Sequence, residues 1–394
     1  MPPIPRHPTT PPRLVTLILL TGLSTLSLNM FLPALAQIAD DLGSDYGTMT
    51  LAVGGYLALT AVVQLGVGSL ADRLGRRPVL LGALAVFVLA SAGCALAPDA
   101  ATFLAARALQ AAVVGGSVLS LAIVRDTTEA HAVAGRLATI ASAMALAPLL
   151  GPLLGGALAA ALGWRAVFWT YAGAGMVLWA VCFVDVGETG RRRSKAGAVG
   201  GRRALLQSPS FVSHVSCAAF SVGAFYVFLA GAALVATTAF SLSEALLGVV
   251  IGSITVGFLA GSTVAARLSG RVASGGVMLA GRVIAVVGLA LGLLAWAGGV
   301  THPVTYFGAT ICVGIGNGLT MPSANAGAMA VRPELAATAA GTSGAATVLV
   351  GAALTTLAGA TLTEANAAPM LLALMLAASI LALAAAVWAM RTKG

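Results

Sequence analysis

Arg107 and Gln110 stand out because a charged and an amide side chain interrupt a long apolar run at a spacing that puts both on one helix face. A charge inside a membrane span costs about 2.5–3.5 kcal/mol on insertion scales, so it usually faces a cavity or a partner. A guanidinium stays protonated and cannot itself carry a proton. It can bind a ligand or shift the pKa of a neighbouring acid. The alternative is that Arg107 lies near a helix end and extends to the lipid headgroups.

A second charged cluster lies between two apolar runs and comprises Gly68, Asp72, Arg73, Gly75, Arg76 and Arg77. Asp72 could pair with Arg73 or Arg76, or cap the N-terminus of another helix. The glycines permit a close helix approach and a tight turn. If these contacts exist in only one of two conformations, they bias the equilibrium between them. The alternative is that the arginines only set the topology.

A third pattern places helix-bending and small residues together at Gly151, Pro152, Gly155 and Gly156. Proline removes a backbone donor and kinks a helix. Glycine allows two helices to approach closely. The pattern predicts a bent, tightly packed helix.

Residues for enzymatic chemistry are scattered. The four histidines, at positions 7, 131, 214 and 302, form no catalytic or metal-binding constellation. The cysteines Cys94, Cys182, Cys217 and Cys312 lie in apolar segments without paired spacing and are expected to pack as small apolar residues. There is no Walker-type phosphate loop. We therefore expect no metal, no cofactor and no direct use of ATP.

The elements that must position these residues are membrane-spanning helices. The chain is 59% hydrophobic and 8% charged, and apolar runs of about 20 residues recur, which is enough to cross a bilayer. We expect an all-α integral membrane protein with twelve spans at 14–37, 48–70, 78–97, 100–123, 134–160, 165–185, 211–236, 245–267, 276–298, 303–327, 338–360 and 367–389.

The loops between these spans alternate in charge. One side carries most of the arginines, including Arg267, Arg271 and Arg282, and the other carries Asp40, Asp41, Asp45, Asp99, Glu244 and Glu364. The positive-inside rule then predicts that both termini are cytoplasmic. The net charge of +9 comes from short loops, so nucleic-acid binding is not expected.

The domain organisation follows from one long polar segment near the middle of the chain. We expect a cytoplasmic tail at 1–13, a six-helix bundle at 14–185, a basic cytoplasmic linker at 186–210, a second six-helix bundle at 211–390 and a tail at 391–394. A degenerate echo of the Asp72 cluster, from Gly261 to Arg271, indicates that the two bundles are pseudo-symmetric.

These patterns together resemble the major facilitator superfamily. The Asp72 cluster resembles its loop between helices two and three, Arg107–Gln110 its helix-four motif with Ala111 in place of the usual glycine, and Gly151–Gly156 its antiporter motif G-P-x-x-G-G. The run Asn29-Met-Phe31-Leu-Pro33-Ala, together with Val124-Arg-Asp126, Gly163-Trp-Arg165 and Gly316–Pro322, is similar to bicyclomycin- and chloramphenicol-resistance antiporters.

The resemblance implies a monomer in the bacterial inner membrane that exports small amphipathic drugs by alternating access, in exchange for protons. Helices one, four, seven and ten would line its cavity. The substrate-contact candidates on them are Asn29, Phe31, Gln110, Tyr226, Phe228, Asn317 and Asn325. Ordinary helix packing is the alternative for each of them.

One departure affects the expected proton coupling, because Asn29 stands where these relatives usually carry an aspartate. Asparagine can hydrogen-bond a ligand but cannot titrate. Asp41, Asp72 and Asp126 are the remaining candidates for coupling. The alternatives are a metabolite exporter or an uncoupled facilitator of the same fold and, from another class, a membrane-embedded enzyme or a sensor that does not transport.

Overall fold

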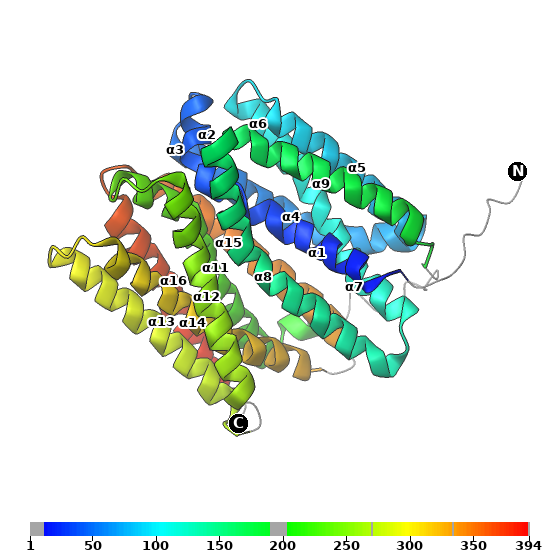
Figure 1. Ribbon diagram of the computed structural model, residues 1–394. Helices are drawn as coiled ribbons and strands as arrows, with labels where there is room; N and C mark the ends of the chain where they lie inside the picture. The colour runs from blue at the N-terminus through cyan, green and yellow to red at the C-terminus, as the bar shows by residue number, and fades with distance from the viewer. Residues whose placement is uncertain (1–11, 190–202, 269–270, 333–334, 393–394) are drawn as a thin grey trace, which may run out of the picture.

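The computed structural model describes residues 12–189, 203–268, 271–332 and 335–392, and the regular structure within these ranges is helical throughout (Figure 1). The first half of the chain contains α1 (Leu14–Asn29), η1 (Leu32–Ala34), α2 (Leu35–Asp41), α3 (Tyr46–Met49), α4 (Leu51–Leu74), α5 (Arg76–Ala95), α6 (Ala100–Gln110), η2 (Ala111–Val113), α7 (Val114–Thr127), α8 (Ala130–Leu162) and α9 (Trp164–Asp185). The second half contains α11 (Pro209–Thr238), α12 (Glu244–Leu268), α13 (Ser274–Ala297), α14 (Pro303–Ala330), α15 (Ala336–Thr361) and α16 (Ala367–Arg391).

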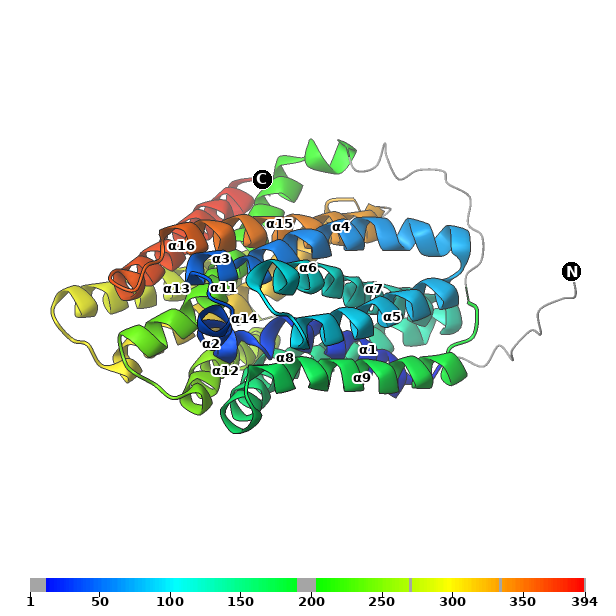
Figure 2. The ribbon, with the colours of Figure 1, turned by 90° about the horizontal axis from the view of Figure 1, so that it is seen from above.

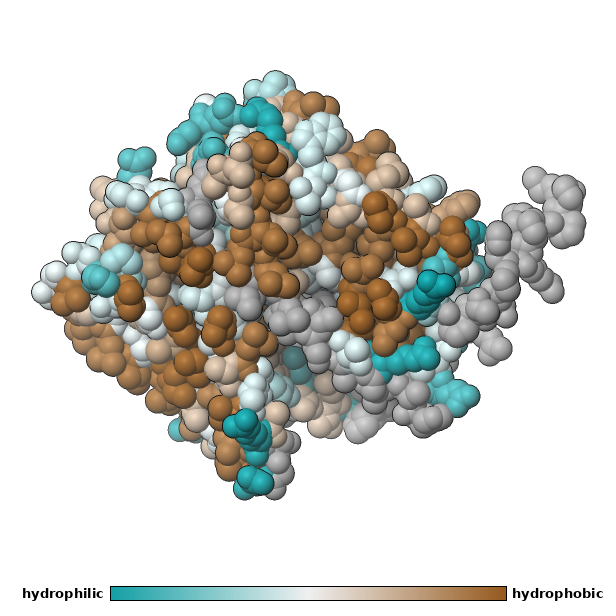
Figure 3. Space-filling view, viewed as in Figure 1, coloured by the Kyte–Doolittle hydropathy of each residue, from teal (hydrophilic) through white to brown (hydrophobic). Residues whose placement is uncertain are grey.

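The expectation of an all-helical membrane protein is confirmed. Eleven segments of the described chain are long and apolar enough to cross a membrane, and α8, with its apolar part Leu150–Leu162, occupies the place of the remaining predicted span. Apolar side chains cover much of the lateral face in view, while hydrophilic ones gather towards the ends of the bundle (Figure 3). This is the surface expected of a bundle whose sides face lipid.

Two of the predicted spans contain a 3₁₀ turn that interrupts the α-helix. The span expected at 14–37 consists of α1, η1 and α2, with a break at Met30 and Phe31. Pro33 lies inside η1 and has no N–H to continue the helical hydrogen bonding. The span expected at 100–123 likewise passes through a short 3₁₀ turn, η2, directly after Gln110. Both interruptions lie beside residues that the sequence analysis selected.

The helix ends define two faces of the bundle. The acidic end contains the connecting segments 42–45, 96–99, 239–243, 298–302 and 362–366. The basic end contains the turn at Gly75 and the segments 128–129, 186–189 and 331–332. Most of the predicted linker and the chain ends, at 190–202, 1–11 and 393–394, lie outside the described residues.

Among the described elements, the two halves meet chiefly along two helix pairs. Viewed from above, α4 runs beside α15 (Figure 2), and α8 contacts α12. The closest approaches lie towards the acidic end: a Cβ atom on Gly47 would come 2.6 Å from the carbonyl oxygen of Gly359, and one on Gly54 would come 2.9 Å from Oγ1 of Thr356. Towards the basic end, α8 and α12 spread apart (Figure 1).

Candidate functional site

Arg107 is a buried cation held by neutral groups, with only 1% of the residue exposed. Its Nη2 donates to the carbonyl of Ser27 at 2.6 Å, and its Nε donates to the carbonyl of Ala52 at 3.2 Å. The Phe31 and Tyr56 rings each lie 4.2 Å from its guanidinium carbon, a distance that suits cation–π contact. Arg107 therefore faces a neighbouring helix, and the alternative in which its side chain extends to the lipid headgroups is wrong.

The break in α1 explains how Ser27 can receive this charge. The last carbonyls of a helix have no donors within the helix. They also form the negative end of the helix dipole, where a cation is stabilised. Because α1 ends at Asn29, the carbonyl of Ser27 is available to Arg107. The sequence predicted that Arg107 is a functional residue, but it did not reveal that the Arg107 side chain binds the C-terminal end of another helix, α1.

Gln110 completes this cluster from the same face of α6. Its Oε1 accepts from Arg107 Nη1 at 2.6 Å, and its Nε2 donates to Oγ of Ser91 at 2.7 Å. Gln110 is fully buried, so in this conformation its amide positions Arg107 and joins α6 to α5. The described residues place no carboxylate in an ion pair with Arg107.

The glycines of α8 pack directly on the break in α1. A Cβ atom at Gly155 would overlap the carbonyl of Met30, and one at Gly151 would come 3.2 Å from Cβ of Asn29. On the other side of α8, a Cβ at Gly248 of α12 would lie 2.5 Å from the carbonyl of Pro152. This stretch of α8 therefore contacts both α1 and the second half of the chain.

The Asp72 cluster forms an ion-pair network at the basic end. Arg76 lies 2.6 Å from Asp126 and 3.9 Å from Asp72. Glu188, just after α9, accepts from the backbone N–H groups of Arg76 and Arg77 at 2.9 and 3.3 Å and so caps α5. Gly75 makes the preceding turn with a φ of 101°, a conformation that favours glycine.

The acids at the opposite end serve as anchors and caps. Asp41 pairs with Arg165 and accepts from Nε1 of Trp164 at 3.0 Å, which fastens the start of α9. Hydrogen bonds from Thr48 hold the pKa of Asp45 below its ordinary value. The backbone amide of Thr102 does the same for the pKa of Asp99.

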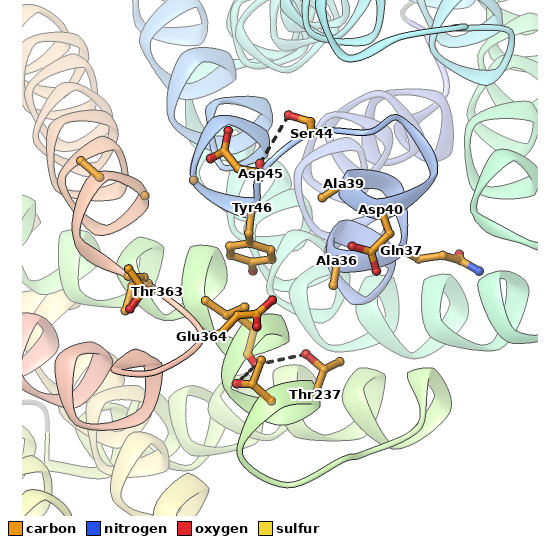
Figure 4. Close-up of a pocket in the computed structure, with 16 residues that line it drawn as sticks. Ala36, Gln37, Ala39, Asp40, Ser44, Asp45, Tyr46, Thr237, Thr363 and Glu364 are labelled. Atoms are coloured by element: carbon orange, nitrogen blue, oxygen red, sulfur yellow. Dashed lines mark hydrogen bonds between the residues drawn. The ribbon is translucent and has the colours of Figure 1, made fainter.

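A cavity of about 720 Å³ lies at the acidic end between the two halves (Figure 4). Asp40, Asp45 and Glu364 belong to its walls. Beside them, the hydroxyl of Tyr46 donates to the carbonyl of Ala230 at 2.6 Å and so connects α3 to α11. This contact and the glycine approaches around Gly47 and Gly54 close the acidic end around the cavity.

Two further cavities lie between the halves on the side of the basic end. The α12 cavity, of about 370 Å³, has walls from α8, α11, α12 and α14 that include Pro148, Phe225, Thr255, Phe258, Asn317 and Asn325. The α15 cavity, of about 360 Å³, has walls from α4, α14 and α15 that include Gln64, Ser343 and Thr347. They share Met321 and Asn325, and among the residues that the structure describes no ionisable side chain lines either one.

The substrate-contact candidates separate into two groups in this structure. Asn317 and Asn325 line the α12 cavity. Phe31, Gln110 and Phe228 are fully buried within their own halves, and Asn29 is only 2% exposed, with its Nδ2 bonded to the carbonyl of Thr25. Tyr226 packs against Gly351 of the same half. Their side chains are engaged in packing, and the cavity walls come mainly from α12, α14 and α15.

The position of Arg282 corrects the charge pattern that was predicted from the sequence. It was assigned to the basic loops, but it is fully buried in α13, where its Nε donates to Oγ1 of Thr320 and its Nη2 donates to Oδ1 of Asn317, both at 2.8 Å. The amide of Asn317 in turn donates to the carbonyl of Ser221 at 3.1 Å. Close backbone packing of Gly281 on Gly316 brings α13 near enough to α14 for these bonds.

Comparison with known proteins resolves the family. A family model described as "Major Facilitator Superfamily" matches residues 17–356. The chain belongs to this superfamily. The prediction of a membrane transporter rather than an enzyme is thereby confirmed.

The curated relatives of this superfamily member include drug-resistance proteins. It is 32% identical over 212 residues to a chloramphenicol resistance protein of Pseudomonas aeruginosa, a match covering 52% of this chain and 50% of the relative. It is also 32% identical over 163 residues to the multidrug resistance protein MdtL of Escherichia coli strain UTI89, covering 41% and 42%. The matched regions thus span half or less of these relatives.

Two solved structures match nearly the whole length of this chain. A bacterial homologue of the human lysosomal transporter Spinster, in an inward-facing and occupied conformation, gives a TM-score of 0.78 at 16% identity and covers 98% of both chains. The unoccupied inward-facing form gives 0.74, also at 16% identity, and covers 96% of this chain and 94% of that one. At this identity the likeness concerns the fold alone.

Proposed function

We propose that this transporter exports small uncharged amphipathic drugs of the phenicol or bicyclomycin type by alternating access. The observation that carries the proposal is the pair of cavities between the halves. Their described walls are apolar, with aromatic rings in the α12 cavity, a few hydroxyl and amide groups and no ionisable side chain. Such walls suit a neutral ligand with few polar groups. The name of the chloramphenicol resistance protein supports the same substrate class, and the name of the multidrug resistance protein supports drug export.

The orientation that makes this movement an export is part of the proposal. The described arginines Arg76, Arg77 and Arg332 lie at the basic end, and Asp45, Asp99 and Glu364 lie at the acidic end. The positive-inside rule then places the basic end and both termini in the cytoplasm of a bacterial cell. The α12 and α15 cavities would receive the drug from that side.

The test is uptake of radiolabelled chloramphenicol into everted membrane vesicles from bacteria that express the full chain. We expect energised vesicles to accumulate several times more drug than vesicles without the protein. Met321→Trp is the matched variant, because Met321 lines both cavities and a larger side chain there would narrow them, and it should remove the accumulation at equal expression. Wild-type vesicles that accumulate neither chloramphenicol nor other neutral antibiotics would point to a metabolite exporter instead.

Proton exchange is a further part of the proposal. It is supported by the antiporter-type stretch of α8 that packs on α1 and α12. A second candidate, drug movement without a proton, is favoured by the positions of Asp41, Asp72 and Asp126, because none of these acids lines the α12 or α15 cavity. A pH-sensitive dye inside the same vesicles separates the two. Drug-induced loss of the proton gradient indicates exchange, and drug uptake without a dye response indicates uncoupled movement.

A further inference from the structure

Thr255 differs from the other hydroxyl side chains of α12. Ser253 donates to the carbonyl of Val250 at 2.7 Å, and Ser262 and Thr263 donate to the carbonyl of Leu259 at 3.0 and 2.8 Å. These bonds within the helix are the usual solution for a hydroxyl in an apolar environment. Thr255 is only 4% exposed, and its Oγ1 has no hydrogen-bond partner.

Thr255, the residue that carries this unpartnered hydroxyl, belongs to the wall of the α12 cavity. Leaving a buried hydroxyl unpaired costs free energy that a hydrogen bond would recover. The neighbouring amide of Asn317 is already engaged, because it accepts from Arg282 and donates to Ser221. Thr255 is therefore a buried polar group of this cavity with its hydrogen-bonding capacity unused.

The backbone around Thr255 is held firmly. A Cβ atom at Gly314 of α14 would overlap the carbonyl of Ile254, the residue before Thr255. A Cβ at Gly257, two residues after it, would lie 2.6 Å from the carbonyl of Ile311. Because α12 and α14 touch through their backbones on both sides of Thr255, the backbone that carries its hydroxyl has a fixed place. A fixed polar group loses little entropy when a ligand binds it.

We propose that Thr255 is the specificity-determining hydrogen-bond partner of the transported drug, and that the drug is an uncharged aromatic compound carrying an amide, hydroxyl or nitro group. The aromatic part would lie against Phe225 and Phe258, which line the same cavity. A threonine hydroxyl can donate and accept at once, so it serves any of these polar groups. This inference rests on the proposed function and adds the residue that selects the substrate.

The test is equilibrium binding of radiolabelled chloramphenicol to the purified full chain. Thr255→Val keeps the shape of the side chain without its hydroxyl and should weaken binding by about three- to tenfold, the usual range for one neutral hydrogen bond. Thr255→Ser restores the hydroxyl and should bind within about twofold of wild type. Thr263→Val makes the same exchange on the same helix at an exposed residue that is bonded to Leu259, and it should leave binding unchanged.

The outcomes separate this inference from the proposed function. If Thr255→Val binds chloramphenicol as tightly as wild type, the role of Thr255 is overturned and drug export stands. If the Ser variant is as weak as the Val variant, the residue acts through packing and the inference is also overturned. If the folded wild-type protein binds no chloramphenicol at millimolar concentration, the proposed substrate class fails and the inference fails with it. Thermal unfolding of each variant verifies that it is folded.

Discussion

Arg107 shows how a permanent charge can be accommodated inside an apolar bundle without a counter-charge among the described residues. Three carbonyl or carboxamide oxygens and two aromatic faces take the place of water around the guanidinium. Hydrogen bonds to a charged group are stronger than neutral ones. The flat guanidinium also presents its donors in a fixed fork that a lysine cannot reproduce. The cluster therefore depends on arginine itself and not only on positive charge.

Arg107→Lys should lower both stability and chloramphenicol transport. The ammonium cannot reach the carbonyls of Ser27 and Ala52 together, and one lost bond to a charged group costs about 1.5–3 kcal/mol. We expect transport in everted vesicles to fall about tenfold or more, together with a lower thermal-unfolding midpoint of the purified protein. Arg165→Lys is the control, because its ion pair with Asp41 is about half exposed and such pairs contribute little. Equal behaviour of the two variants would contradict a special role for Arg107.

At the scale of elements, the break in α1 and the small residues of α8 form one unit. α1 ends at Asn29, the carbonyl of Ser27 in its last turn accepts from Arg107, and α8 packs its glycines against the same break. Through Pro152 and Gly248 this unit also contacts α12 of the second half. A change in the packing of α8 would therefore reach the Arg107 cluster and the interface between the halves together.

Gly155→Ala should disrupt this unit. The added methyl group would overlap the backbone carbonyl of Met30, so α1 and α8 must separate, and overpacking of this kind costs about 1–3 kcal/mol. We expect a lower unfolding midpoint and a loss of chloramphenicol uptake. Gly173→Ala is the matched control, since a Cβ there meets no other atom within 4 Å. Normal uptake by the Gly155→Ala variant would show that α1 and α8 need not stay in close contact.

At the scale of the whole molecule, the two halves contact each other around the cavity at the acidic end and enclose two smaller cavities towards the basic end. The Asp72 network lies at the basic end and joins α4, α5 and α7 with the segment after α9 within the first half. If the halves move by alternating access, as proposed, contacts at the basic end must change when that end closes. The network is thus well placed to influence the equilibrium between the two states.

Asp72→Asn should lower chloramphenicol uptake without lowering the unfolding midpoint. The Asp72 side chain is 51% exposed and lies 3.9 Å from Arg76, so the pair adds little to stability. Its effect would come from the relative stability of the two states. Asp99→Asn at the acidic end is the control, because asparagine also caps helices well and both properties should be retained. Full uptake by the Asp72→Asn variant at wild-type expression would remove the proposed influence on the equilibrium.

Much of the architecture could be predicted from local composition. The span expected at 78–97 is observed as Arg76–Ala95, and the one expected at 367–389 as Ala367–Arg391. Hydropathy and charge are averages over neighbouring residues, and the bilayer acts on those averages directly. The same averaging concealed Arg282, because a single arginine near a basic loop has the same local pattern whether it faces the headgroups or a neighbouring helix.

The sequence by itself determined the number and order of the spans, the alternation of charge and the motifs that indicate the superfamily. Only the tertiary structure decided which polar groups meet. It assigned Gln110 to Arg107, Asn317 to Arg282 and Thr255 to the cavity wall. The reason is physical: these contacts depend on the rotation of each helix and on close backbone approaches such as Gly314 against Ile254. The rotation of a helix and its closest approach to a neighbour depend on pairs of helices that are distant in the chain. A stretch of sequence from one helix therefore does not specify them.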